Sequence, residues 1–267
     1  MKLPIVRIEG WSVSKLSSWE ECPLRTQLYY AQSLCPICFK GKVMGGFDSP
    51  KVCDTCGKTI EDKFKHGNET GKALEEYVNG SSKKFPSVIR NETVRTLARK
   101  LREAHKNGKA VAEYSITLDN EWRPISKFTK NAYFRARFDV IQYLPQKVIA
   151  IFDWKAYGIN KRSGEIYVKS KYQDQLSIYC MAALSNRPDK LIARAGLVFY
   201  DAGPRFDPIV MRSAGDVLRE DLKDMQRYWA GKAAAMLADD VFAPRPGDPY
   251  CGYCDYSKEK GGPCPVA

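Results

Sequence analysis

The chain contains 267 residues, of which 44% are hydrophobic and 28% are charged, so it is long enough to bury a substantial core. Its 43 Lys and Arg exceed its 31 Asp and Glu by 12, which suits a polyanionic partner such as nucleic acid but also an ordinary basic soluble protein. No apolar run approaches the roughly 18 residues that span a bilayer, and residues 1–12 lack the core of a signal peptide. We therefore expect a cytoplasmic protein with no membrane partner.

The first part of the chain predicts three helices, over residues 12–33, 68–79 and 91–106. Ser12 or Ser14 is the expected N-cap of the first helix, and Pro23 should kink or split it. Between the first two helices, the composition shifts to glycine, lysine and cysteine, and neither a helical nor a strand period persists.

The middle of the chain predicts strands over residues 110–118, 131–143, 147–154 and 194–200, which are rich in Val, Ile, Tyr and Phe. The third of these is almost entirely apolar, as expected for a central strand that is buried on both faces. Two further helices are predicted over 171–185 and 213–238, followed by a tail rich in Pro, Gly and Cys. This order of elements predicts an α/β fold.

Two carboxylates stand on adjacent predicted strands, Asp139 on one and Asp153 at the end of the next. Mg²⁺ and Mn²⁺ prefer oxygen ligands, so the two carboxylates can share one such ion, which would polarise a phosphoryl oxygen and activate a water. Lys155 points to the same face as Asp153, where it can stabilise charge on a phosphate. The alternative is two edge carboxylates and a solvated lysine, because a D-x-K triplet is common by chance.

These residues resemble the motifs of the PD-(D/E)xK nuclease superfamily, in its RecB-like branch. The family's G-x-x-D motif appears at residues 136–139 with Ala136 in place of glycine, its second motif appears at 153–155, and its Q-x-x-x-Y helix appears at 175–179. The resemblance covers most of the chain apart from 34–58. It implies a restriction-endonuclease-like core with a central mixed β-sheet flanked by helices.

The resemblance also implies the roles of individual residues. In that branch Asp139 and Asp153 hold the metal, Lys155 is catalytic, and the carbonyl of Trp154 is a further ligand. Such a chain would be a metal-dependent nuclease that uses Mg²⁺ or Mn²⁺.

Two helices complete the implied site. Gln175 and Tyr179 face the same way on their helix and would contact DNA or support the site. The family's upstream helix usually reads G-x-x-x-H-x-x-x-E, and its histidine is often a metal ligand. Here Gly71 stands at the histidine position, while Glu75 remains and is expected to reach the metal directly or through water. His66 lies just before this helix, where a role as a surface loop residue is expected.

Four of the nine cysteines form two C-x-x-C pairs, at Cys35, Cys38, Cys53 and Cys56. The odd number of cysteines and the lack of a visible export signal argue against a disulfide scaffold. Four thiolates at this spacing are typical of a structural zinc ribbon, so we predict a Zn²⁺-binding insertion over 34–58. The alternative is four unpaired thiols in a loop.

Three more cysteines, Cys251, Cys254 and Cys264, lie in the tail and need a fourth ligand, for which Cys22 is the natural candidate. This layout resembles the iron–sulfur nucleases of the RecB-like branch, which include AddB-type helicase-nucleases and nucleases of CRISPR adaptation. It implies a [4Fe–4S] cluster that clasps the two chain ends. Zinc in this site is the alternative. Cys180 is expected to be a buried small hydrophobe.

Several basic and aromatic residues near Asp139 are candidate DNA contacts. Residues 133–137 interleave the two kinds of side chain, and basic residues follow the strand of Asp153 at Lys161, Arg162, Lys169 and Lys171. For each residue alone, a solvated loop is the alternative.

Together these features predict a DNA exonuclease that acts on single strands or free ends, in a bacterial or phage-infected cell. One nuclease domain would span 1–267, with the ribbon at 34–58 and an iron–sulfur segment at 242–267. Replication, recombination, repair and CRISPR spacer processing are the processes it would serve. The alternatives are a non-cleaving DNA-binding protein and a structure-specific endonuclease on the same fold.

Overall fold

A computed structural model describes residues 7–44, 51–60, 65–126, 128–129, 132–156, 170–201, 207–245 and 251–265. The chain forms two compact units, one made of Met1–Lys63 with Ala230–Ala267 and the other made of Phe64–Trp229. Of the helices in these described ranges, none combines the length and the apolarity that crossing a bilayer requires.

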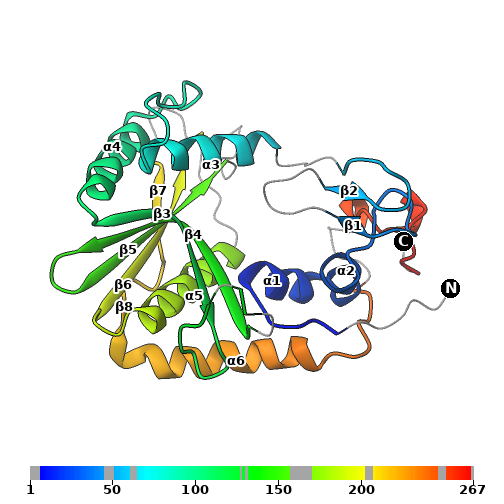
Figure 1. Cartoon of the computed structure of the whole chain (residues 1–267). Helices are drawn as coiled ribbons and strands as arrows, with labels where there is room; N and C mark the ends of the chain where they lie inside the picture. The colour runs from blue at the N-terminus through cyan, green and yellow to red at the C-terminus, as the bar shows by residue number, and fades with distance from the viewer. Residues whose placement is uncertain are drawn as a thin grey trace. The chain divides into compact units, whose positions relative to one another are not determined.

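The second unit is built on a six-stranded mixed sheet with the strand order β3-β4-β5-β6-β7, and β8 also pairs with β6 (Figure 1). The strands are β3 (Ala110–Leu118), β4 (Phe134–Leu144), β5 (Val148–Lys155), β6 (Ile192–Phe199), β7 (Ile209–Met211) and β8 (Val217–Leu218). Strands β5 and β6 are parallel, and every other pair is antiparallel. A parallel pair needs a crossover connection, and the helix α5 (Ser170–Asn186) lies in it.

Helices cover both faces of this sheet (Figure 1). On one face, α3 (Lys65–Val78) and α4 (Glu92–Lys106) bury Leu74 and Leu101 in a cluster that includes Trp154 of β5. Successive side chains of a strand point to opposite faces, so Asp153 faces the other layer, where it contacts Gln175 of α5. The apolar strand predicted around residue 150 is confirmed as a central strand that is mostly buried on both faces.

The long helix predicted over 213–238 is wrong in its first part, because α6 (Leu222–Ala238) begins nine residues later. The preceding residues form β8, in which Val217 pairs with Ala193 of β6, and then a short 3₁₀ turn (Arg219–Asp221). Pairing with a distant strand therefore overrides a local pattern that also fits a helix.

The first unit begins with α1 (Val13–Glu21), which is capped by Ser12 as predicted. The predicted break at Pro23 is confirmed: Cys22 is extended, and Pro23 starts α2 (Pro23–Thr26), where its missing N–H costs nothing. A π-helical turn (Gln27–Ala31) follows, and then two short strands, β1 (Val43–Met44) and β2 (Val52–Cys53). In its described residues, 242–245 and 251–265, the tail contains two 3₁₀ turns, Cys251–Tyr253 and Lys258–Lys260.

Hydrogen bonds join the two ends of the chain within this first unit. The Trp19 indole N–H donates to Asp239 Oδ2 at 2.7 Å, and the buried Tyr256 hydroxyl donates to the Leu34 carbonyl at 2.8 Å. Tyr256 also packs in a small apolar cluster with Leu28 and Leu34. The tail is thus part of the same body as the N-terminal helices.

Candidate functional site

Asp139 lies where β4 loses its regular pairing with both neighbouring strands. Glu113, the residue opposite Asp139 in β3, has a φ of 53° and is absent from an otherwise continuous register. On the other side, the pairing of β4 with β5 ends one residue away, at Val140. The backbone N–H of Trp154 donates to Asp139 Oδ2 at 2.6 Å instead of to a backbone carbonyl. The broken ladder therefore provides the donor that fixes this carboxylate.

Asp153 lies near the end of β5 and is only 3% exposed. Its Oδ1 accepts a hydrogen bond of 3.2 Å from Gln175 Nε2, and its Oδ2 forms an ion pair with Lys155 Nζ. The Lys155 ammonium also lies 5.2 Å from the ring centroid of Tyr172. Asp153 and Lys155 thus share a face, as their spacing predicts, and α5 packs against both.

Gln175 and Tyr179 connect α5 to this carboxylate. The amide of Gln175 donates to the Tyr179 hydroxyl at 2.8 Å as well as to Asp153. The Tyr179 ring packs edge-on against Phe138 with 4.8 Å between centroids. Burial raises the pKa of Tyr179 well above its ordinary value, and the charges of Asp153 and Asp139 raise it further, so its phenol stays neutral. The geometry gives this pair a supporting contact with Asp153.

The two aspartates interact strongly. Burial raises the pKa of Asp139 to about 7, and the nearby charge of Asp153 raises it too, against the opposing effect of Lys155. Burial lowers the pKa of Lys155, but the charges of Asp153 and Asp139 raise it more, so this ammonium stays protonated. Two carboxylates thus face a single ammonium. The oxygen donors and the unbalanced negative charge fit a hard divalent cation.

Glu75 of α3 lies at the margin of the site. Burial raises its pKa, Arg137 lowers it and Asp139 raises it, so both charges lie within electrostatic reach. Among the described residues, however, Glu75, Asp139 and Asp153 do not form a set whose oxygens all lie within 4.8 Å of one another. A Cβ added at Gly71, one turn before Glu75, would meet no heavy atom within 4 Å. Packing therefore does not require glycine at the position to which the motif resemblance assigns a histidine.

Two contacts of the site were not anticipated from the sequence. Tyr172 flanks Lys155, and its position three residues before Gln175 on a helix could have indicated this. Glu113 forms an ion pair with Arg137, and no local signal predicts its unusual backbone. The side chain of His66 and the candidate DNA contacts Lys161, Arg162 and Lys169 lie outside the described residues.

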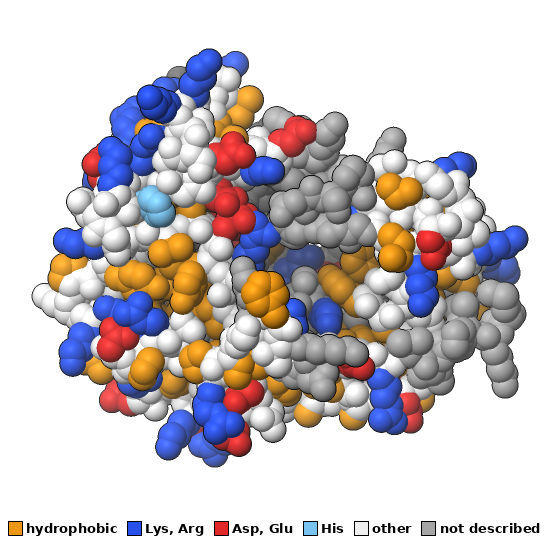
Figure 2. Space-filling view, in the orientation of Figure 1, with side chains coloured by type: hydrophobic (Ala, Val, Ile, Leu, Met, Phe, Trp, Pro, Cys, Tyr) orange, Lys and Arg blue, Asp and Glu red, His pale blue; other side chains and the backbone are white. Residues whose placement is uncertain are grey.

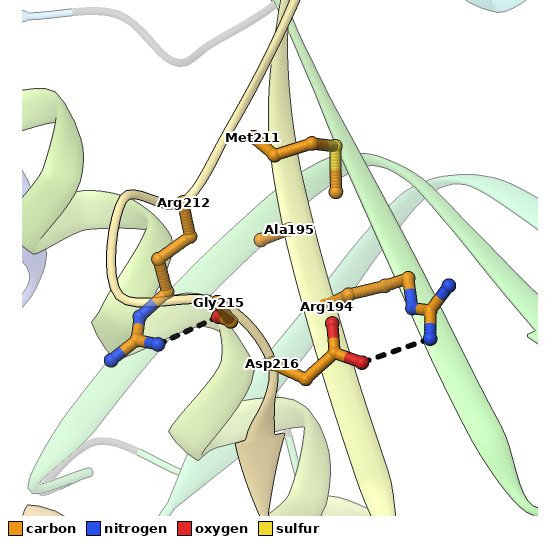
Figure 3. A pocket seen from close by; sticks show the side chains of 6 residues that line it. All are labelled: Arg194, Ala195, Met211, Arg212, Gly215 and Asp216. Atoms are coloured by element: carbon orange, nitrogen blue, oxygen red, sulfur yellow. Dashed lines mark hydrogen bonds and ion pairs between the residues drawn. The ribbon is translucent and has the colours of Figure 1, made fainter.

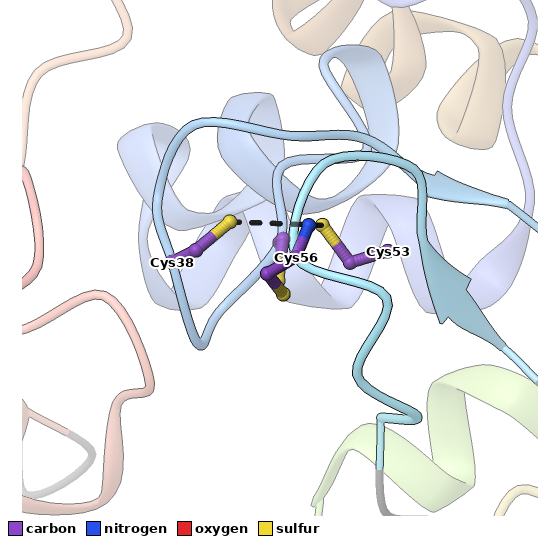
Figure 4. Close-up of side chains that lie close together, drawn as sticks. Cys38, Cys53 and Cys56 are labelled. Atoms are coloured by element: carbon purple, nitrogen blue, oxygen red, sulfur yellow. Dashed lines mark hydrogen bonds between the residues drawn. The ribbon is translucent and has the colours of Figure 1, made fainter.

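In the first unit, the Sγ atoms of four cysteines all lie within 4.8 Å of one another: Cys35, Cys38, Cys53 and Cys56. Figure 4 shows Cys38, Cys53 and Cys56 of this set. Backbone N–H groups donate to these sulfurs, as Ile37 does to Cys35 at 3.4 Å and Gly41 does to Cys38 at 3.5 Å. The Gly41 N–H lowers the pKa of Cys38 to about 6, which favours its thiolate. A Cβ on Gly41 would lie 2.6 Å from the sulfur of Cys53, so only glycine fits there. The arrangement can hold one tetrahedral metal ion.

The other four predicted ligands, Cys22, Cys251, Cys254 and Cys264, also belong to the first unit. Arg25 lies within electrostatic reach of both Cys22 and Cys254. No three of these four sulfurs lie within 4.8 Å of one another in the described chain. A single tetrahedral ion needs such closeness, whereas an iron–sulfur cluster binds each thiolate through a different iron and so spreads its ligands further.

One pocket of about 240 Å³ opens beside β6 and contains none of these residues (Figure 3). Its lining includes Arg194, which pairs with Asp216 at 2.9 Å, and Arg212, which donates to the Gly215 carbonyl at 2.7 Å. It is smaller than the roughly 300–1,000 Å³ of ordinary ligand pockets, and its charged groups already have partners. We assign no ligand to it.

Comparison with known proteins identifies one family. A family model described as the PD-(D/E)XK nuclease superfamily matches residues 10–258. No curated protein matches the sequence. Among the solved structures that resemble the chain is SSO0001, which is 15% identical with a TM-score of 0.41, over 98% of this chain and 88% of that one. Another is the "Putative exonuclease" of Eubacterium rectale, which is 14% identical with a TM-score of 0.42, over 86% of this chain and 80% of that one. Both TM-scores are low, so the assignment depends on the family model.

The pKa of Asp139 leads to a stability prediction. Because this pKa lies near 7 in the folded state and near 3.8 for an ordinary aspartate, the folded chain binds the proton more tightly. The resulting stability is full at low pH and is lost as the pH rises to about 7. Asp139→Asn keeps the acceptor for Trp154 without the charge, so at pH 8 and without added divalent ions its melting temperature should exceed that of the wild type by several degrees.

The matched control is Asp189→Asn. The hydrogen bond from Arg187 lowers the pKa of Asp189 to about 2, so this substitution should give no stability gain at pH 8. Equal melting temperatures for the wild type and Asp139→Asn at pH 8 would contradict the prediction.

Proposed function

Because this chain belongs to the PD-(D/E)XK nuclease superfamily, we propose that Asp139, Asp153 and Lys155 form the metal-dependent site at which it hydrolyses phosphodiester bonds in DNA. The observation that carries this proposal is the pairing of two carboxylates, buried Asp153 and half-buried Asp139, with one ammonium. A divalent ion would neutralise the excess negative charge. The family as a whole is one of nucleases that use divalent metals.

The residues of the site have distinct proposed tasks. Asp139 and Asp153 would hold Mg²⁺ or Mn²⁺, with the Trp154 carbonyl and Glu75 as further ligands, directly or through water. Such an ion, when bound, polarises a phosphoryl oxygen and lowers the pKa of a water. Lys155 offers a permanent positive charge to the phosphate oxygens as negative charge grows on them.

Gln175 would keep Asp153 in place through the hydrogen bond at 3.2 Å, and Tyr179 in turn fixes the Gln175 amide. Because the amide of Gln175 donates to both partners, it also sets the orientation of the carboxylate relative to Lys155. These two residues position the site without carrying charge into it.

The proposed mode of action is exonucleolytic, on single-stranded DNA or on free ends. The resemblance to iron–sulfur nucleases of the RecB-like branch supports this choice. Replication, recombination, repair or CRISPR spacer processing would be the setting, in the cytoplasm of a bacterial or phage-infected cell.

The nuclease proposal predicts that the purified protein degrades end-labelled linear DNA when Mn²⁺ or Mg²⁺ is added. Asp153→Asn and Lys155→Ala should each lower the rate at least about 100-fold, because the first removes a charged ligand of the proposed metal ion and the second removes the positive charge that faces the phosphate. Asp189→Asn and Lys147→Ala change the same residue types at exposed positions and should leave the rate unchanged.

Two other outcomes would contradict this proposal. A wild-type protein that binds DNA but stays inert with every divalent ion would be a non-cleaving binding protein. Cleavage of closed circular single strands, which have no ends, would identify an endonuclease.

The space beside Gly71 permits a second test of the metal site. Gly71→His should fold, because an added Cβ meets no heavy atom within 4 Å, and its side chain would share a helix face with Glu75. Gly71→Ala should gain roughly 0.5–1 kcal/mol from the loss of a helix glycine, and Gly71→His should gain less, because histidine is a poorer helix former than alanine. Only Gly71→His should show an additional rise in melting temperature with Mn²⁺. Equal Mn²⁺ responses would argue against a metal beside this helix.

We also propose that the cluster of Cys35, Cys38, Cys53 and Cys56 holds structural Zn²⁺ as a zinc ribbon, and that the set of Cys22, Cys251, Cys254 and Cys264 holds a [4Fe–4S] cluster. The compact sulfur set supports the first assignment, and the resemblance to the iron–sulfur nucleases of the RecB-like branch supports the second. Neither site has an open position in this proposal, so both would stabilise the fold.

Metal analysis of anaerobically purified protein should therefore find about one zinc and four iron atoms per chain, with a brown colour. Cys38→Ser should lose the zinc and retain the iron, whereas Cys254→Ser should lose the iron and retain the zinc. Cys180→Ala removes a buried thiol that belongs to neither set, so this variant should keep both metals. Colourless protein with about two zinc ions per chain would overturn the iron–sulfur assignment.

A further inference from the structure

The surface of α4 and of the loop before it holds much of the positive charge of the protein. Residues 83–109 carry nine Lys and Arg against two Glu. Their net charge of +7 is more than half of the +12 of the whole chain, although they make up 27 of its 267 residues. Figure 2 shows Lys and Arg gathered over α4, at the upper left of the view.

Two of these cations are structural. The Arg102 guanidinium lies 4.6 Å from the ring centroid of Tyr77 and donates to the carbonyls of Tyr77 and Ser82, at 3.0 and 2.7 Å. Arg95 lies 5.2 Å from the ring centroid of Phe85. These contacts fasten the loop between α3 and α4 onto α4. The exposed lysines of that loop are therefore held beside the helix.

The remaining seven cations are exposed and define a basic ridge: Lys83, Lys84, Arg90, Arg99, Lys100, Lys106 and Lys109. Arg99 pairs with Glu92 at 3.1 Å, and Lys106 pairs with Glu103 at 2.6 Å. The other five form no ion pair with any residue in the described ranges. An ordinary solvated face intersperses both signs of charge, whereas here the cations outnumber the two acidic side chains by a wide margin.

We propose that the basic ridge binds the phosphate backbone of duplex DNA, at a surface separate from the Asp139–Asp153–Lys155 site. The choice of DNA rests on the proposed nuclease function. With its 15 residues, α4 extends over about 22 Å, along which a duplex presents a phosphate charge roughly every 1.7 Å. A line of cations of this length can neutralise several phosphates at once.

The absence of stacking residues favours a duplex over a single strand. Proteins that bind single strands combine cations with aromatic platforms on which bases stack. Phe85 is the only Phe, Tyr or Trp among residues 83–109, and its ring lies under Arg95. The nearby ring of Tyr77 lies under Arg102. The ridge would therefore contact the charged phosphates of DNA and not its bases. It would anchor the duplex part of a substrate whose end is being degraded.

The test compares two variants of equal net charge. The ridge variant carries Lys83→Gln, Lys84→Gln, Lys100→Gln and Lys109→Gln, and the control carries Lys147→Gln, Lys223→Gln, Arg227→Gln and Lys258→Gln at other exposed positions. Affinity for a labelled blunt duplex is measured without divalent ions, so that the DNA stays intact, over a series of salt concentrations. A third variant with arginine at the four ridge positions preserves the charge.

Loss of four phosphate contacts should reduce the slope of log affinity against log salt by about 3–4 and weaken duplex binding about tenfold or more at moderate salt. The control and the arginine variant should bind as the wild type does. Cleavage of a short single-stranded oligonucleotide should be unchanged in the ridge variant, because it leaves Asp139, Asp153 and Lys155 intact.

The possible failures are distinguishable. Equal duplex binding by the ridge variant and the control would overturn the inference, even if the protein cleaves DNA. An equal loss of affinity for a single strand without secondary structure would overturn the preference for a duplex. If the ridge variant loses binding to phosphatidylserine vesicles but binds the duplex as the wild type does, the ridge is a membrane-binding surface and the inference is overturned. A ridge-dependent loss of duplex affinity in a protein that never cleaves DNA would sustain the inference and refute the nuclease.

Discussion

Two interacting carboxylates, buried Asp153 and half-buried Asp139, are the constraint on which the candidate site of the second unit depends. Burial and mutual repulsion both oppose the ionisation of Asp139 beside Asp153. The fold offsets this cost with one ammonium, one side-chain amide and one backbone N–H. The last of these is available only because β4 leaves its regular pairing at Asp139. The break in strand pairing at Asp139 and the unusual backbone of Glu113 therefore lie at the candidate site.

Charge is unevenly distributed within the second unit. Carboxylates converge at the end of β5, whereas α4 presents cations to solvent with few acidic partners. A polyanion would be repelled by the first surface until a metal ion binds there, and attracted by the second surface at all times. In the first unit, Leu28, Leu34 and Tyr256 form a small apolar cluster, and four cysteine sulfurs lie close enough together to hold one metal ion.

The sequence by itself determined the features that depend on local spacing. Alternating and continuous apolar runs predicted the strands around the site, and the two-residue step placed Asp153 and Lys155 on one face. The two C-x-x-C pairs predicted the four-cysteine cluster, because a tight knuckle turns both thiols toward the same point. Ser12 and Pro23 likewise marked helix boundaries through the chemistry of their own side chains.

Only the tertiary structure decided what depends on segments far apart in the chain. The pairing of Val217 with Ala193 shortened the helix α6, although its own sequence fits a longer one. The packing of three strands against α3 decides several features of the site. It sets the contact of Trp154 with Asp139, the unusual backbone of Glu113 and the position of Glu75 at the edge of the site. The clustering of cations into the ridge also required the loop before α4 to fold back onto that helix. Local periodicity in the sequence does not predict such contacts, because they depend on how distant helices and strands pack together.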